Sequence, residues 1–224
     1  DALLELKKTE IDKKREFLIK SYNQETFHLL KAEIIAQLAE DDSNQGLELI
    51  RKAINDKDVN VRKAVVLDIT KINVNLRDDY EKLLKDSSYQ VITTALDNLV
   101  YSFPEQTETY LETTKNEWGA TGIGIRIKWL EIAFISRKDN QYIDELAKYA
   151  NINRYESYTV MNAIQALKRL NYLNDKILQY LFEDATYWNN RINPDARDAL
   201  AFFYAQNQYR KMIKEGFQKL DNNS

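Results

Sequence analysis

The sequence predicts an all-α fold: an α-solenoid, a right-handed superhelix of stacked helical pairs. One reason is the scarcity of turn residues, with five Gly and two Pro in 224 residues, whereas β-sandwiches and barrels need many. A second reason is the apolar spacing, because Phe27, Leu30, Ile34 and Leu38 step by three, four and four residues along one helix face. The third is a short pattern that returns at steps of roughly thirty residues.

The repeating pattern is clearest over residues 55–66, where an acidic turn leads into a small-apolar helix start that carries Arg62. Aligning the second helix of each pair on that position gives intervals of 31, 30, 34, 35 and 36 residues between the equivalents Lys31, Arg62, Ile92, Arg126, Met161 and Arg197. This pattern resembles the signature of HEAT-type repeats and, more broadly, of HEAT/armadillo-like helical pairs. Stacked pairs of this kind present extended surfaces rather than one cleft.

Capping residues mark where individual helices begin. Asn193 precedes Pro194 and Asp195, which predicts a capping Asn, a Pro at the first helical position and an acid in the first turn. Pro104 is expected to open another helix in the same way.

The two ends of the chain predict terminal helices of different character. An amphipathic helix is expected over about residues 12–22, and a polar closing helix over about residues 209–220. We therefore expect a single domain over 1–224 with about five to six helix pairs. The chain begins at Asp1 without an initiator Met, which indicates a domain excised from a longer protein.

Composition restricts the classes of partner and compartment. Lys and Arg total 32 and Asp and Glu total 35, a net charge of −3. That balance offers no cationic excess for nucleic acid, so no nucleic-acid partner is expected. No apolar run approaches the roughly 20 residues of a membrane span, so no membrane partner is expected. The absence of Cys excludes disulfides, thiolate metal sites and a Cys nucleophile, and it fits an oxidising compartment.

No constellation of residues predicts catalysis, metal binding or cofactor binding in this chain. His28 is the single histidine, and a zinc hydrolase needs at least two nitrogen ligands. A surface or half-buried role is therefore favoured for His28 over a catalytic triad. The glycines of 119–124 stand in the reverse order of a dinucleotide loop, which favours an inter-helix turn over a phosphate cradle.

Aromatic residues supply the candidate groove or interface residues. They are Tyr155, Tyr158, Tyr187 and Trp188, with Arg191 beside them. Tyr and Trp combine contact area with one polar group, which favours interfaces. Core packing remains the alternative interpretation for each aromatic residue.

Five segments in order carry a more specific resemblance: 124–131, 162–171, 193–197, 202–204 and 208–210. The first reads Gly-Ile-Arg-Ile-Lys-Trp-Leu-Glu and the third Asn-Pro-Asp-Ala-Arg. Together they resemble the C-terminal HEAT-like helical domain of zinc aminopeptidases of the aminopeptidase N family, as found in Bacteroidetes-type bacteria.

The resemblance implies a non-catalytic domain that walls the catalytic cleft of its parent enzyme and restricts peptide access. The family's His-Glu-x-x-His and Gly-x-Met-Glu-Asn motifs do not occur here, so no catalytic or zinc-binding residue is carried over. Zinc is expected in the catalytic domain of the parent, which would also be the partner. The same resemblance and the absence of Cys favour a periplasmic or secreted location, while the compartment itself stays open.

Two other functions remain open at this stage. One is a stand-alone HEAT-repeat scaffold that binds a protein or peptide along its concave face. The other is a HEAT-like DNA alkylpurine glycosylase, which needs a basic concave track that the net charge of −3 disfavours.

Overall fold

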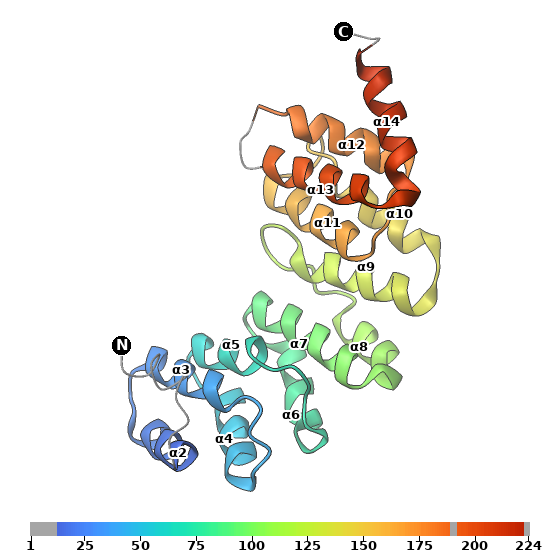
Figure 1. The fold of residues 1–224 in the computed structure, drawn as a ribbon. Coiled ribbons are helices and arrows are strands. Elements are labelled where there is room, and N and C mark those ends of the chain that lie inside the picture. Colours follow the sequence, from blue (N-terminus) through green and yellow to red (C-terminus); the bar gives the residue numbers. More distant parts are fainter. Residues whose placement is uncertain (1–12, 189–191, 222–224) are drawn as a thin grey trace. The chain divides into compact units, whose positions relative to one another are not determined.

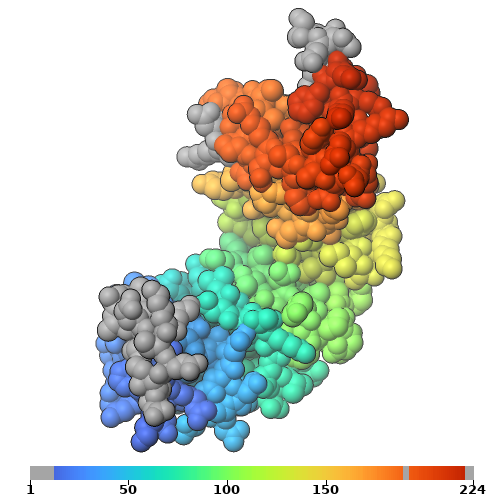
Figure 2. All heavy atoms as spheres, viewed as in Figure 1, coloured from blue at the N-terminus to red at the C-terminus, as the bar shows by residue number. Residues whose placement is uncertain are grey.

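The chain is an all-α protein built from successive helical pairs (Figure 1). A computed structural model describes residues 13–188 and 192–221, and in those ranges all regular structure is helical. The chain divides into two compact units, Asp1–Thr114 and Lys115–Ser224. Within each unit, successive segments of the chain form adjacent bands of atoms in Figure 2. The predicted fold class is confirmed; the single domain expected over 1–224 stays a prediction.

Unit 1 contains pairs whose second helices pack side by side. Its helices are α2 (Lys14–Gln24), α3 (His28–Leu38), α4 (Asn44–Ile54), α5 (Val59–Leu67), η1 (Val74–Leu76), α6 (Arg77–Lys82), η2 (Leu83–Lys85), α7 (Tyr89–Ser102), η3 (Pro104–Gln106) and α8 (Thr107–Thr114). The second helix α5 lies between α3 and α7. Its Val61 and Val65 are fully buried, and the hydroxyl of buried Tyr80 donates to the Val65 carbonyl at 2.9 Å. Of the helix face expected from the spacing, Ile34 and Leu38 are buried and Leu30 is half-buried, whereas Phe27 is the cap residue of α3 and is 50% exposed.

Unit 2 continues the same pairing. Its helices are α9 (Gly124–Arg137), α10 (Asn140–Lys148), α11 (Ser157–Arg169), α12 (Asp175–Thr186), α13 (Asn193–Ala205) and α14 (Asn207–Asp221). Helix α11 packs on α9 and α10, and α13 packs on α11 and α12. Within this core Glu131 is 5% exposed, and its two oxygens accept from Arg169 at 2.8 and 2.6 Å. The buried carboxylate is therefore paired, as burial of a charge requires.

The repeat alignment is confirmed, because its six positions fall on the third to fifth residues of α3, α5, α7, α9, α11 and α13. The structure shows what the basic residue at this position does. Arg62 donates to both carboxylate oxygens of Asp86, at 2.6 and 3.0 Å, and to the carbonyl of Asp56 at 2.9 Å. One repeat earlier, Lys31 lies 3.5 Å from the Asp56 carboxylate. The side chain thus links its own turn to the acidic turn of the next pair.

Burial alone would raise the pKa of Asp86, but the hydrogen bonds from Arg62 and from the Ser88 amide hold that pKa below its usual range. The Asp86 carboxylate is therefore kept ionised by its partners. This turn therefore connects two helices and also joins consecutive helical pairs through the ion pair between Arg62 and Asp86.

One of the two expected helix starts differs in detail from the sequence expectation. Asn193 is the first residue of α13 rather than its cap, because Ile192 occupies the cap position without a side-chain hydrogen bond. The amide of Asn193 donates instead to the Tyr187 carbonyl at 3.3 Å. Pro104 does open a helix, the short η3 that leads into α8. The expected terminal helices appear as α2 and α14, and Asp12 lies outside the described residues.

Residues 119–123 lie in the connection between α8 and α9, as expected of an inter-helix turn, and Gly124 is the first residue of α9. Gly119 and Gly122 have φ of 83° and 89°, values that favour glycine. A Cβ at Gly122 would lie 2.8 Å from Asn162 Nδ2 and 3.2 Å from Tyr158 Cβ. Glycine is therefore needed there both for conformation and for space.

Candidate protein-binding surface

Five aromatic residues mark one side of unit 2, on or directly after the connections that lead into α9, α11 and α13. The first turns of these three helices lie on the same side of the unit, at the left in Figure 1. We call the set the aromatic edge; it comprises Trp118, Tyr155, Tyr158, Tyr187 and Trp188. Trp188 is 80% exposed, Tyr158 51% and Trp118 48%. Tyr155 and Tyr187 are half-buried.

Hydrogen bonds tie the first two connections together. Asn162 Nδ2, in the second turn of α11, donates to the Gly122 carbonyl at 2.9 Å. Glu156 caps α11 by accepting from the amides of Tyr158 and Thr159, both at 2.8 Å. The pKa of Glu156 is lowered because the hydrogen bond from the Thr159 hydroxyl, these two amide bonds and one from the Gly122 amide outweigh the effect of burial. The loop bearing Trp118 is thereby fixed against the start of the helix bearing Tyr158.

The second and third connections are linked through the end of α12. The Ile152 amide donates to Asp184 Oδ1 at 3.4 Å, and Asn153 Nδ2 donates to Glu183 Oε2 at 3.1 Å. Asp184 itself is fully buried. These bonds hold the connection that bears Tyr155 against the end of α12, after which Tyr187 and Trp188 follow.

A charged network behind the edge positions two of its rings. Arg126 donates to both oxygens of Glu145 at 2.8 and 2.9 Å, and its Cζ lies 5.4 Å from the Trp118 ring centroid. Tyr149 donates to Glu145 at 3.2 Å and meets Tyr155 edge to face at 5.0 Å. Burial, with a further contribution from Glu145, raises the pKa of Tyr149 to about 12. The phenol thus stays protonated and available as a donor.

The third connection presents the most exposed ring. Tyr187 and Trp188 lie with centroids 5.5 Å apart at an interplanar angle of 39°. Four of the five residues proposed from the sequence therefore lie on the aromatic edge, while Arg191 lies outside the described residues. Their binding role stays a prediction.

Sequence reasoning missed Trp118. Its signal was present, since a Trp stands directly before the glycine-rich turn and eight residues before the repeat position Arg126. Only the fold shows that Arg126 turns back to stack on it.

Within residues 13–188 and 192–221, no group of three or more His, Cys, Asp and Glu could hold a metal ion. His28 Nδ1 lies 3.7 Å from Asp58 Oδ2, and its ring contacts Phe27 at 5.1 Å. In the same described ranges, no helix has the length and apolarity needed to cross a membrane.

Comparison with known proteins gives one structural likeness. No protein-family model matches the sequence. No curated protein matches it either. Among solved structures, a designed armadillo repeat protein is similar with a TM-score of 0.42 and 17% identity, covering 83% of this chain and 98% of that chain.

Proposed function

We propose that the chain is a helical-repeat scaffold that binds a segment of another polypeptide along the aromatic edge of unit 2. The observation that supports this most is the exposure of Trp188, Tyr158 and Trp118 on adjacent connections. Trp and Tyr dominate binding energy in protein interfaces, where burying one ring often contributes about 2 kcal/mol or more. Exposed together on one edge, these rings offer such a binding surface.

The proposed mechanism is recognition by a preorganised surface. Ring faces cover apolar side chains of the ligand, while the Tyr hydroxyl and the indole N–H bind its backbone carbonyls. Arg126 and Glu145 hold Trp118 from behind, so little side-chain entropy is lost on binding.

A selection of random displayed peptides on the whole immobilised chain tests this function. Dissociation constants of the selected peptides are then measured for the wild type and for Trp188→Ala and Tyr158→Ala. Each variant should bind at least about tenfold more weakly. Tyr101→Ala is the matched control, because Tyr101 is 69% exposed but lies on α7 in unit 1. Undiminished binding by both edge variants would refute the proposal.

A finer form of the proposal is that the bound polypeptide is the catalytic domain of a zinc aminopeptidase of the aminopeptidase N family. Its support is the sequence resemblance, whose segments 124–131 and 193–197 open α9 and α13. Zinc would then be held by that catalytic domain. This chain alone should show neither peptidase activity nor stoichiometric zinc, and either result would contradict a purely accessory role. A His-Glu-x-x-His motif encoded several hundred residues upstream would support it.

A further inference from the structure

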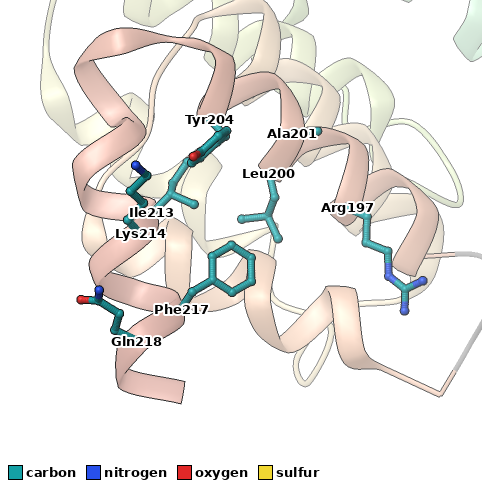
Figure 3. A pocket seen from close by; sticks show the side chains of 8 residues that line it. All are labelled: Arg197, Leu200, Ala201, Tyr204, Ile213, Lys214, Phe217 and Gln218. Carbon is teal, nitrogen blue, oxygen red and sulfur yellow. The ribbon is translucent and has the colours of Figure 1, made fainter. Parts of the chain in front are cut away.

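An apolar groove of about 580 Å³ lies between α13 and α14. Leu200 and Ile213 form its floor, and both are buried. Tyr204 from α13 and Phe217 from α14 form its walls and remain 40% and 48% exposed. Figure 3 shows the Phe217 ring standing between the two helices, with Ala201 on the side of α13. Apolar surface left open in this way marks an interaction site.

The groove occupies a defined place in the repeat. Within unit 2, α11 packs on α10, the first helix of its own pair, and on the preceding second helix α9, and α13 packs in the same way on α12 and α11. Helix α14 packs against α13, as the first helix α10 packs against the preceding second helix α9. A second helix paired with α14 would therefore contact α14 and α13 together, and the groove is lined by those two helices.

The register of α13 supports this placement. With the repeat interval of 36 residues, the groove residues of α13 correspond in α11 to Met161, Ile164, Gln165 and Lys168. Two of these contact the following second helix: Gln165 Nε2 donates to Asp195 Oδ1 at 2.9 Å, and Lys168 forms an ion pair with Asp198. The residues of α11 that contact α13 therefore correspond, one repeat later, to the residues of α13 that line the groove.

The contact between α12 and α14 fixes the outer wall of the groove. A Cβ at Gly216 would lie 2.6 Å from Phe182 Cε2, so glycine lets α14 approach α12 closely. The neighbouring Phe217 ring meets Phe182 edge to face at 4.8 Å. The groove is therefore preformed, which lowers the entropy cost of filling it.

Charge indicates the chemistry of the occupant. The charged residues among the eight that line the groove are Arg197 and Lys214, both cationic. In the corresponding contact one repeat earlier, α13 contributes two aspartates, Asp195 and Asp198, to its contact with α11. A second copy of α14 would instead bring further cations such as Lys211 and Lys214 against the groove, and like charges repel.

We propose that this groove binds an acidic amphipathic helix, seated where the second helix of the next pair would lie. Its apolar stripe covers Leu200, Ala201 and Phe217, and its flanking carboxylates pair with Arg197 and Lys214. The groove shares no residue with the aromatic edge. This proposal can therefore be tested independently of the proposed function.

A synthetic peptide and the whole chain test the proposal. The peptide has a helical core of 13 residues, the length of α11 and of α13, with leucines along one face and glutamates on both flanks. Fluorescence anisotropy of the labelled peptide should show saturable one-to-one binding. The same peptide with lysines in place of glutamates should bind at least about tenfold more weakly.

Three variants locate the site. Ala201→Arg fills the groove and should weaken binding by about a hundredfold, and Lys214→Glu should weaken it by about tenfold. Lys211→Glu is the matched control: it makes the same charge change on the same helix, at a side chain that is 88% exposed and outside the groove. Its affinity should stay within about twofold of the wild type.

Thermal unfolding followed by circular dichroism shows whether each variant is folded. If Ala201→Arg does not fold, the affinities of Lys214→Glu and Lys211→Glu for the acidic peptide still show whether the peptide binds in the groove. Equal weakening by these two variants, or no saturable binding of the acidic peptide, would overturn the proposal. So would a dimer in sedimentation that Ala201→Arg dissociates, because the occupant would then be a second copy of the chain.

Discussion

Asp184 gives the sharpest quantitative prediction about stability. Its side chain on α12 is fully buried, Oδ1 accepts one bond from the Ile152 amide at 3.4 Å, and Oδ2 accepts no hydrogen bond. Burial raises the pKa of this carboxyl from 3.8 to about 7, and the neighbouring Glu183 charge adds to the rise. We expect Asp184→Asn to stabilise the protein above neutral pH while keeping the acceptor for Ile152.

The size of the effect follows from proton linkage. The rise from 3.8 to about 7 is about three pKa units, and at 1.36 kcal/mol per unit it sets an upper limit of about 4 kcal/mol. Because the folded carboxyl keeps its proton to higher pH than the unfolded one, its stabilisation is complete below pH 3.8. That stabilisation is lost as the pH rises to about 7. Asparagine does not ionise, so the variant should be more stable at pH 8 by about 2 to 4 kcal/mol.

Urea unfolding followed by Trp fluorescence is the assay, at pH 5 and at pH 8. The three tryptophans of the sequence, Trp118, Trp129 and Trp188, all lie in unit 2, so their emission reports on the unit that contains Asp184. Glu183→Gln serves as the control and should have a smaller effect, since it removes only a neighbouring charge. An unchanged pH dependence in Asp184→Asn, or a loss of stability at pH 8, would refute the reasoning.

Two further predictions concern the turns. Arg62→Ala should lower the free energy of unfolding by about 2 to 4 kcal/mol, because it leaves the mostly buried Asp86 carboxylate without its cation. Chemical denaturation followed by circular dichroism measures this loss. A loss below about 0.5 kcal/mol would contradict a stabilising ion pair between consecutive helical pairs. Gly122→Ala should cost about 1 to 3 kcal/mol, because φ is 89° and the new Cβ would lie 2.8 Å from Asn162 Nδ2. Gly124→Ala is its control, with no atom within 4 Å of the added Cβ; equal losses in both glycine variants, measured by urea unfolding with Trp fluorescence, would count against the packing argument.

The helices and the repeat could be predicted from the sequence because both arise from local patterns. Apolar spacing reports which helix face is buried, and the acidic turn before a basic first helical turn reflects a bond between adjacent repeats. Arg62 and Asp86 show this directly, since the pair that defines the pattern is the pair that forms the contact.

Other features depend on tertiary structure and could not be predicted from the sequence. Trp118 belongs to the aromatic edge because Arg126, anchored by Glu145, stacks on it. The expected cap at Asn193 was wrong because its amide is drawn to the Tyr187 carbonyl. These contacts join residues whose proximity no local pattern encodes.

Asp184 is an intermediate case. It falls three residues after Leu181 and seven after Ile177, on the apolar face of α12. Helical periodicity could therefore have predicted a buried carboxylate. Its unsatisfied oxygen and raised pKa required the packed structure.

Hydrogen exchange of the whole chain, with and without a peptide selected for binding, tests the proposed binding surface most directly. We expect bound peptide to slow amide exchange in residues 115–123 and 149–156, the connections that carry Trp118 and Tyr155, and in the first turn of α11, which carries Tyr158. Residues of unit 1 should exchange at the same rate in both samples. Slowed exchange confined to unit 1, or to α13 and α14 without the connections, would contradict binding at the aromatic edge.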